Sequence, residues 1–221
     1  MSWPSRRLAL ALLLLILASL AAVTFVVAGD LLDPGDRHDT TPDLTPPTLA
    51  PEALLPRVFE VAAGESRVDF TAQVAGVALD GVFPVRGGTI TLEPVDDALR
   101  VHARLEIDVD GLETGNAVFD QVLRAALASG DYPLAFFAAT SEQLVPVTEE
   151  PVAFTLAGEL ELHNVVRPHA MQVDAQLRAG TIRAEAVSAL NLADHGVTLP
   201  ALLGSPAIDL RAVITAHEAS Q

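Results

Sequence analysis

Long runs in which apolar and polar residues alternate with period two constrain this chain more than any other feature. The clearest runs cover residues 68–74, 100–109, 152–162 and 171–178, and weaker ones follow at 182–186 and 208–214. Period-two alternation is typical of antiparallel strands that bury one face and expose the other. Several runs exceed the usual strand length of about five or six residues. The sequence therefore predicts a domain built from long antiparallel strands.

Seven or eight such strands must each bury an apolar face, as they do in a sandwich or a closed barrel. Long strands favour the barrel because closure removes the unpaired edges. We predict turns at Gly87-Gly88, at Pro94–Asp97 and at Ala179–Thr181, where glycine, proline or aspartate punctuates the pattern. The prediction is thus an all-β, antiparallel domain of seven or eight strands, with a barrel favoured over a sandwich.

The inward-facing side chains decide whether such a barrel is hollow. A barrel of about eight strands either fills with side chains or encloses one small ligand. Small inward residues such as Ala72, Ala103 and Gly158 leave volume, so an elongated apolar channel and a tightly packed core both remain open. The channel hypothesis assigns ligand contacts to Val68, Phe70, Ala72, Val74, Phe83, Ile90, Val101, Ala103, Leu105, Ile107, Phe137, Phe154, Leu156, Met171, Val173 and Leu190.

One segment, residues 108–140, interrupts the alternation. It carries apolar residues with helical spacing, at Phe119, Val122, Leu123, Ala126 and Leu127. This stripe predicts an amphipathic helix of about three turns, which ends near Gly130. We interpret the helix as a lid over one end of the barrel, with Phe119, Leu123 and Leu127 facing the ligand.

Three polar residues at the start of this helix are expected to fix the lid and not to perform chemistry. Thr114 or Asn116 can cap the helix, because a side-chain oxygen there accepts from the first unpaired amides. Asp120 lies one turn into the helix, near its positive end, where an acid is favoured.

The N-terminal segment predicts export. Residues 8–28 form an uncharged apolar run after Arg6 and Arg7, and such a run is long enough to cross the hydrocarbon core. An uncleaved anchor and a cleavable signal peptide are the two interpretations, and the length favours the anchor. We thus predict a transmembrane helix at 1–29, a linker rich in proline and aspartate at 30–56, and the barrel at 57–218. The arginine pair orients the barrel to the extracytoplasmic face, or the barrel is secreted if the helix is cleaved.

Composition excludes several classes of function. The formal net charge of −16 argues against nucleic acid as a partner, and the absence of cysteine removes disulfides and thiolate sites. His102, His163 and His169 lack the spacing of a zinc site, so we predict no metal. No Gly-x-Ser-x-Gly elbow surrounds a serine, and no nucleophile constellation is visible. We therefore predict no catalytic residues and no enzyme activity.

Several motifs recur in a defined order along the chain. They are Leu112-x-Thr114-x-Asn116-x-x-x-Asp120-x-x-Leu123, Tyr132-Pro133-x-x-x-Phe137, Val68-x-Phe70, Gly81-x-Phe83, Gly88-x-Ile90 and Gly158-x-Leu160-x-Leu162-His163-x-Val165-x-Arg167-Pro168. In this pattern the chain resembles the YceI-like family of exported, lipocalin-like β-barrels, over about residues 57–217.

The resemblance implies an eight-stranded lipocalin-like barrel whose apolar channel binds an isoprenoid lipid, such as a polyprenyl chain or the tail of a quinone. It implies no other cofactor, and the membrane would be reached through the N-terminal helix. The sequence departs from the family pattern at Glu65, Val74, Phe119 and Asn164, where histidine, histidine, arginine and glycine are usual. The resemblance therefore supports tail binding but does not transfer a head-group site, and it names no protein partner. A scaffold domain with a packed barrel and no ligand is the alternative.

Overall fold

The computed structural model describes residues 55–74, 76–199 and 205–220. The predicted transmembrane helix at 1–29, and the linker up to residue 54, lie outside the described residues. Among those that are described, no helix combines the length and hydropathy needed to cross a membrane.

Ten strands and three short helices make up the described chain. The strands are β1 (Arg57–Val61), β2 (Arg67–Val74), β3 (Val77–Val95), β4 (Ala98–Asp108), β5 (Leu134–Ser141), β6 (Val145–Pro146), β7 (Val152–Leu162), β8 (Val165–Arg178), β9 (Thr181–Asn191) and β10 (Ala207–Glu218). The helices are the α-helix α2 (Ala117–Ala126) and the 3-10 helices η2 (Ala63–Glu65) and η3 (Leu192–His195).

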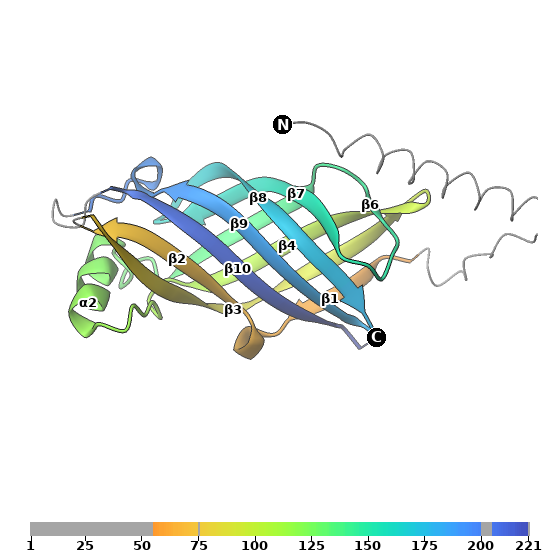
Figure 1. Cartoon of the computed structure of the whole chain (residues 1–221), viewed down its shortest axis with the longest axis horizontal. Helices are drawn as coiled ribbons and strands as arrows, with labels where there is room; N and C mark the ends of the chain where they lie inside the picture. Colours follow the sequence, from red (N-terminus) through yellow and green to blue (C-terminus); the bar gives the residue numbers. More distant parts are fainter. Residues whose placement is uncertain (1–54, 75, 200–204, 221) are drawn as a thin grey trace, which may run out of the picture. The chain divides into compact units, whose positions relative to one another are not determined.

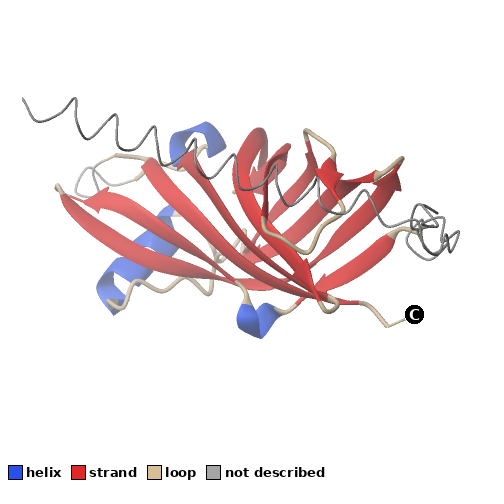
Figure 2. Cartoon of the chain, turned by 45° about the vertical axis from the view of Figure 1, so that its right-hand side comes forward, coloured by secondary structure: helices blue, strands red, loops and turns tan. Residues whose placement is uncertain are grey.

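Eight of the strands close into an antiparallel barrel, as the sequence predicted. The order around the barrel is β2-β3-β4-β5-β7-β8-β9-β10, and β10 pairs with β2 again. Figure 1 and Figure 2 show these strands winding round a common axis, with α2 at one end. The barrel therefore has two distinct ends, which we call the helix end and the hairpin end, the latter formed by the β3–β4 and β8–β9 turns.

The short strand β1 continues the wall beyond Arg67, the first residue of β2. Its residues pair with both neighbours of β2, since Phe59 lies opposite Ile90 on β3 and opposite Glu218 on β10. Helix η2 separates β1 from β2, so the two strands act as one interrupted wall strand. Strand β6 likewise adds to β4 near the β3–β4 turn.

One predicted turn is wrong. Residues Gly87 and Gly88 lie inside the continuous strand β3, where the register with β4 shifts between Val85 and Gly87. Gly88 has a φ of 151°, and a Cβ there would collide with the carbonyl oxygen of Arg104 on β4. The glycine pair thus makes a bulge and a close approach between strands, and does not reverse the chain. The turns at Asp96 and at Ala179-Gly180 are present, with positive φ angles.

Candidate functional site

An apolar cavity of about 170 Å³ lies inside the hairpin end of the barrel. Its mouth is formed by the β3–β4 turn and the segment from β6 to β7, at the end of the barrel away from α2 (Figure 1). Leu55 and Val147 line this mouth and are 58% and 59% exposed, so the cavity opens to solvent there. Aliphatic side chains from five barrel strands form the walls: Ile90, Leu92, Leu99, Val101, Ala103, Val152, Leu156, Val173, Ala175, Leu177, Ile182 and Ala184, joined by Phe154.

The structure brings six of the predicted channel residues together around this cavity. They are Ile90, Val101, Ala103, Phe154, Leu156 and Val173. Further wall residues such as Ala175 and Ile182 continue the same alternation, which is a signal that could have found them. The residues from Val145 to Glu150 at the mouth follow no period, so no comparable pattern indicates their position.

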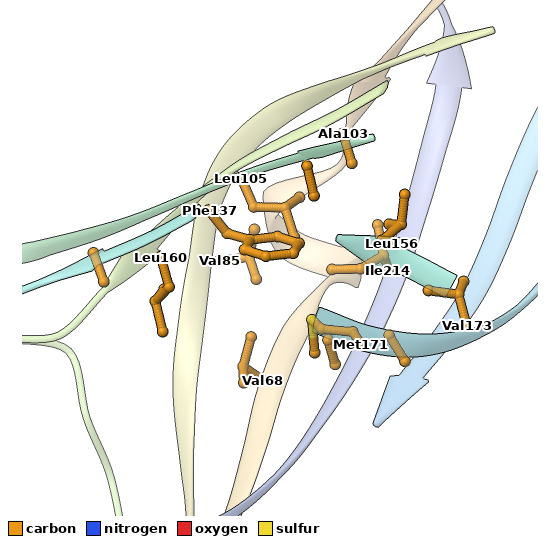
Figure 3. Close-up of a cluster of buried hydrophobic side chains, with 14 of the residues drawn as sticks. Val68, Val85, Ala103, Leu105, Phe137, Leu156, Leu160, Met171, Val173 and Ile214 are labelled. Atoms are coloured by element: carbon orange, nitrogen blue, oxygen red, sulfur yellow. The ribbon is translucent and has the colours of Figure 1, made fainter. Parts of the chain in front are cut away.

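The middle of the barrel is filled by side chains. Val85, Leu105, Phe137, Met171 and Ile214 are all buried, and none of them lines a cavity at either end. We call these five residues the mid-barrel layer; Figure 3 shows their side chains converging in the interior. Along β4, Ala103 lines the cavity, Leu105 belongs to the layer, and Ile107 lines a void beyond it.

Beyond the layer, the helix end holds two small voids of about 20 and 50 Å³. The predicted channel residues that line them are Val68, Phe70, Ala72, Phe83, Ile107, Leu123, Leu127 and Leu190. Phe119 is partly buried and packs against the same core. The side chain of Val74 lies outside what the structure describes.

These positions place α2, which the sequence analysis interpreted as a lid over the ligand, at the end of the barrel away from the cavity mouth (Figure 1). Leu123 and Leu127 pack against Phe70 and Phe83, whose rings lie 4.9 Å apart, so the helix covers a filled end of the barrel. The mouth of the 170 Å³ cavity lies at the other end. An amphipathic stripe indicates that a helix covers apolar surface, but it does not indicate which end of a barrel is open.

The polar residues predicted to fix the helix do so. The side-chain oxygen of Asn116 accepts from the amides of Val118 (3.0 Å) and Phe119 (3.4 Å), as an N-cap does. The Asp120 carboxylate accepts from the hydroxyl and the amide of Thr114, at 2.6 and 2.7 Å. The Thr114 hydroxyl bond, the Thr114 amide and the nearby charge of Arg124 hold the pKa of Asp120 below its ordinary value.

Two further contacts that the sequence did not reveal tie the helix to the loop that precedes it. The guanidinium of Arg124 donates to the carbonyl oxygens of Asp110 (2.7 Å) and Leu112. The hydroxyl of Ser129 donates to the Asp110 carboxylate at 2.7 Å. The helix itself ends at Ala126, four residues before Gly130, and Ala128 just after it has a positive φ of 47°.

A polar pair lies on the inner face of the barrel beside the mid-barrel layer. His169 Nε2 and Ser188 Oγ are 2.9 Å apart, and the His169 ring packs edge-on against Phe137. Burial, and secondly the charge of His195, lower the pKa of His169. His195 is 1% exposed and donates from Nδ1 to the carbonyl oxygen of Val165. Within the described chain, no group of three His, Cys, Asp or Glu side chains is placed to hold a metal.

This histidine environment predicts a pH-dependent stability. The folded state disfavours protonated His169, whereas the unfolded chain takes up the proton below the ordinary pKa of 6.5. Stability is therefore undiminished above that pH and falls as the pH drops through it. We expect the urea midpoint to be lower at pH 5.5 than at pH 8, and His169→Gln to reduce the drop. His217→Gln is the control, because His217 is half-exposed on the outer face of β10, and it should show the same drop as the parent chain. If His169→Gln also shows that full drop, the assignment to His169 is wrong.

Comparisons with known proteins agree with this architecture. A polyisoprenoid-binding domain from Saccharophagus degradans, implicated in plant cell wall breakdown, superposes with a TM-score of 0.58 at 21% identity, covering 73% of this chain and 98% of that chain. BcnA of Burkholderia cenocepacia superposes with a TM-score of 0.56 at 14% identity, covering 70% of this chain and 98% of that chain. No curated protein sequence matches. At these identities the structures share the fold.

The family assignment comes from the sequence of the barrel itself. The YceI-like domain family matches residues 59–216, from within β1 to near the end of β10. This range contains the mid-barrel layer, α2 and the described lining residues of the cavity other than Leu55 and Arg57. The chain therefore belongs to the YceI-like domain family.

Proposed function

We propose that this protein binds an isoprenoid lipid by taking part of its apolar tail into the cavity at the hairpin end, and that it does no chemistry on the lipid. The observation that carries the proposal is an aliphatic cavity of about 170 Å³ that opens at one end of a closed barrel. A second support is the related barrel from Saccharophagus degradans, which is described as a polyisoprenoid-binding domain.

Burial of apolar surface supplies the affinity in this proposal. Removing apolar surface from water contributes roughly 25 cal/mol per Å² before the costs of association are subtracted. The cavity is close in size to an engineered protein cavity of about 150 Å³ that stays dry and binds benzene. A branched hydrocarbon therefore fits the site better than water, which would find few polar partners on these walls.

The charges at the mouth favour an uncharged head group. Asp96, Asp97 and Glu150 all line the cavity. Arg57, the one cation among the described lining residues, donates to both oxygens of Glu218 at 2.7 and 2.8 Å. Among the described residues of the mouth, no guanidinium is thus left unpaired for a phosphate. We infer that a prenol or a quinone is preferred over a polyprenyl phosphate.

The N-terminal sequence supports a position at the outer face of the cytoplasmic membrane. Residues 8–28 are apolar and follow Arg6 and Arg7, and the barrel begins after a linker rich in proline. We infer a single-pass anchor, or release of the barrel if that segment is cleaved. A periplasm-dependent reporter fused after residue 220 tests the orientation, and mass spectrometry of the purified N-terminus tests cleavage.

A wall substitution tests lipid binding. Ala103→Phe and Ala175→Phe place a ring in the cavity, so we expect lipid uptake to be lost while the free energy of unfolding stays nearly unchanged. Native mass spectrometry with added farnesol or farnesyl phosphate measures uptake, and urea unfolding measures stability. Ala212→Phe is the matched control: Ala212 is 2% exposed and lines none of the three interior cavities, so overpacking should cost about 1–3 kcal/mol or more.

The packed mid-barrel layer favours a second candidate function, that of a scaffold domain whose barrel binds no ligand. In that case Ala103→Phe should destabilise the barrel as Ala212→Phe does, and neither farnesol nor farnesyl phosphate should bind to the parent chain. Both results together would contradict the proposed lipid binding.

A further inference from the structure

We propose that the mid-barrel layer sets the length of isoprenoid tail that the barrel takes, with Leu105, Phe137 and Met171 as the specificity-determining residues. The inference rests on the proposed function, because it concerns the tail that the same cavity binds. In this proposal the barrel encloses only a short terminal stretch of the lipid tail and does not enclose a whole polyprenyl chain.

The geometry behind this inference is a partition of the interior. The cavity at the hairpin end has a volume of about 170 Å³, whereas the voids beyond the layer measure about 20 and 50 Å³. Phe137 is 3% exposed, Met171 7% and Leu105 8%, so these side chains are enclosed on all sides. Leu105 and Phe137 lie opposite each other on β4 and β5. Met171 reaches the same region from β8 (Figure 3).

The volume limits how much tail fits. A cavity of about 150 Å³ holds one benzene molecule, which has six carbons. The cavity at the hairpin end therefore encloses about one or two isoprene units of five carbons each. The remaining units of a longer tail must stay at the mouth, against the exposed side chains of Leu55 and Val147. A tail lengthened beyond the enclosed part buries little additional surface.

Truncating the layer should join the two hollow regions. Phe137→Ala or Met171→Ala removes a side chain that separates the cavity from the voids near Ile107 and Leu190. A longer tail would then pass the layer, and its additional units would become buried. Each buried methylene raises affinity by a factor of about four, so one added isoprene unit should be visible as a large change in Kd.

The experiment measures Kd for geraniol, farnesol and geranylgeraniol, which have two, three and four isoprene units. The full chain is kept in an amphipol, whose polymer is too large to enter the cavity. For the parent chain we expect Kd values within about threefold of one another. For Phe137→Ala and Met171→Ala we expect geranylgeraniol to bind at least about tenfold more tightly than geraniol. Leu160→Ala is the control, because Leu160 lines the void beyond the layer and its loss leaves the layer closed.

The outcomes separate this inference from the proposed function. If the parent chain binds prenols with affinity that rises about tenfold per isoprene unit, the length limit is wrong and lipid binding stands. If the parent chain binds none of the prenols, the proposed function fails and the inference fails with it. Should Phe137→Ala not fold, Phe137→Leu and Met171→Ala carry the test, and an unchanged length profile in both would overturn the proposal.

Discussion

Replacing Gly158 with alanine is expected to destabilise the barrel by at least about 3 kcal/mol, the upper end of the usual cost of overpacking. Gly158 lies on β7 opposite Ala139 of β5. A Cβ at this position would collide with the carbonyl oxygen of Ala138 and the Cα of Ala139. Both are backbone atoms, so no side-chain rotation relieves the clash and the two strands must separate.

The expected loss of stability comes from the clash of the new Cβ with the backbone of β5, and not from replacing a glycine as such. Gly87 on β3 is the matched control, because nothing lies within 4 Å of a Cβ built there and its φ is not positive. Gly87→Ala should change the free energy of unfolding by less than about 1 kcal/mol, since alanine also restricts the unfolded chain. Urea unfolding followed by circular dichroism measures both. Equal losses in the two variants would show that the close approach of β5 and β7 is not the cause.

The alternation in the sequence predicted the strands because burial on one face is a local property. The run at 152–162 coincides with β7, and the strand faces of Val101 and Ala103 were correctly assigned to the interior. The start of the helix was predicted within about one residue, because Asn116 carries a cap signal that acts over one turn, whereas the helix ends at Ala126 and not near Gly130.

Features that depend on distant strands could not be predicted in the same way. The glycine pair at 87–88 fits a turn or a bulge equally well, and only pairing with β4 decides between them. Likewise, alternation assigns Leu105, Phe137 and Met171 to the interior but not to a common height in the barrel. The partition of the interior arises from the stagger of the strands, which relates residues far apart in sequence. The barrel is therefore neither hollow nor packed throughout: it is hollow at one end and filled in the middle.

Replacing Phe59 with alanine is expected to cost about 3–5 kcal/mol, as truncation of a buried aromatic residue does. Phe59 is 0% exposed and anchors the short strand β1 between β3 and β10. The Arg57 guanidinium lies 5.1 Å from the centre of its ring while it is paired with Glu218. Loss of the ring therefore removes core packing and also the surface on which this ion pair rests.

The consequence for function follows from the position of β1 in the wall. Leu55 and Arg57 line the mouth of the cavity, so a detached β1 would open the barrel beside the entrance. We expect hydrogen exchange in Phe59→Ala to accelerate in residues 57–61 and in their partners at 89–92 and 216–218 before the rest of the barrel. Val58→Ala is the control, since Val58 is 42% exposed on the same strand and should cost less than about 1 kcal/mol. Uniform acceleration throughout the barrel would contradict a local role of β1, because it would show that Phe59 supports the whole core and not this part of the wall.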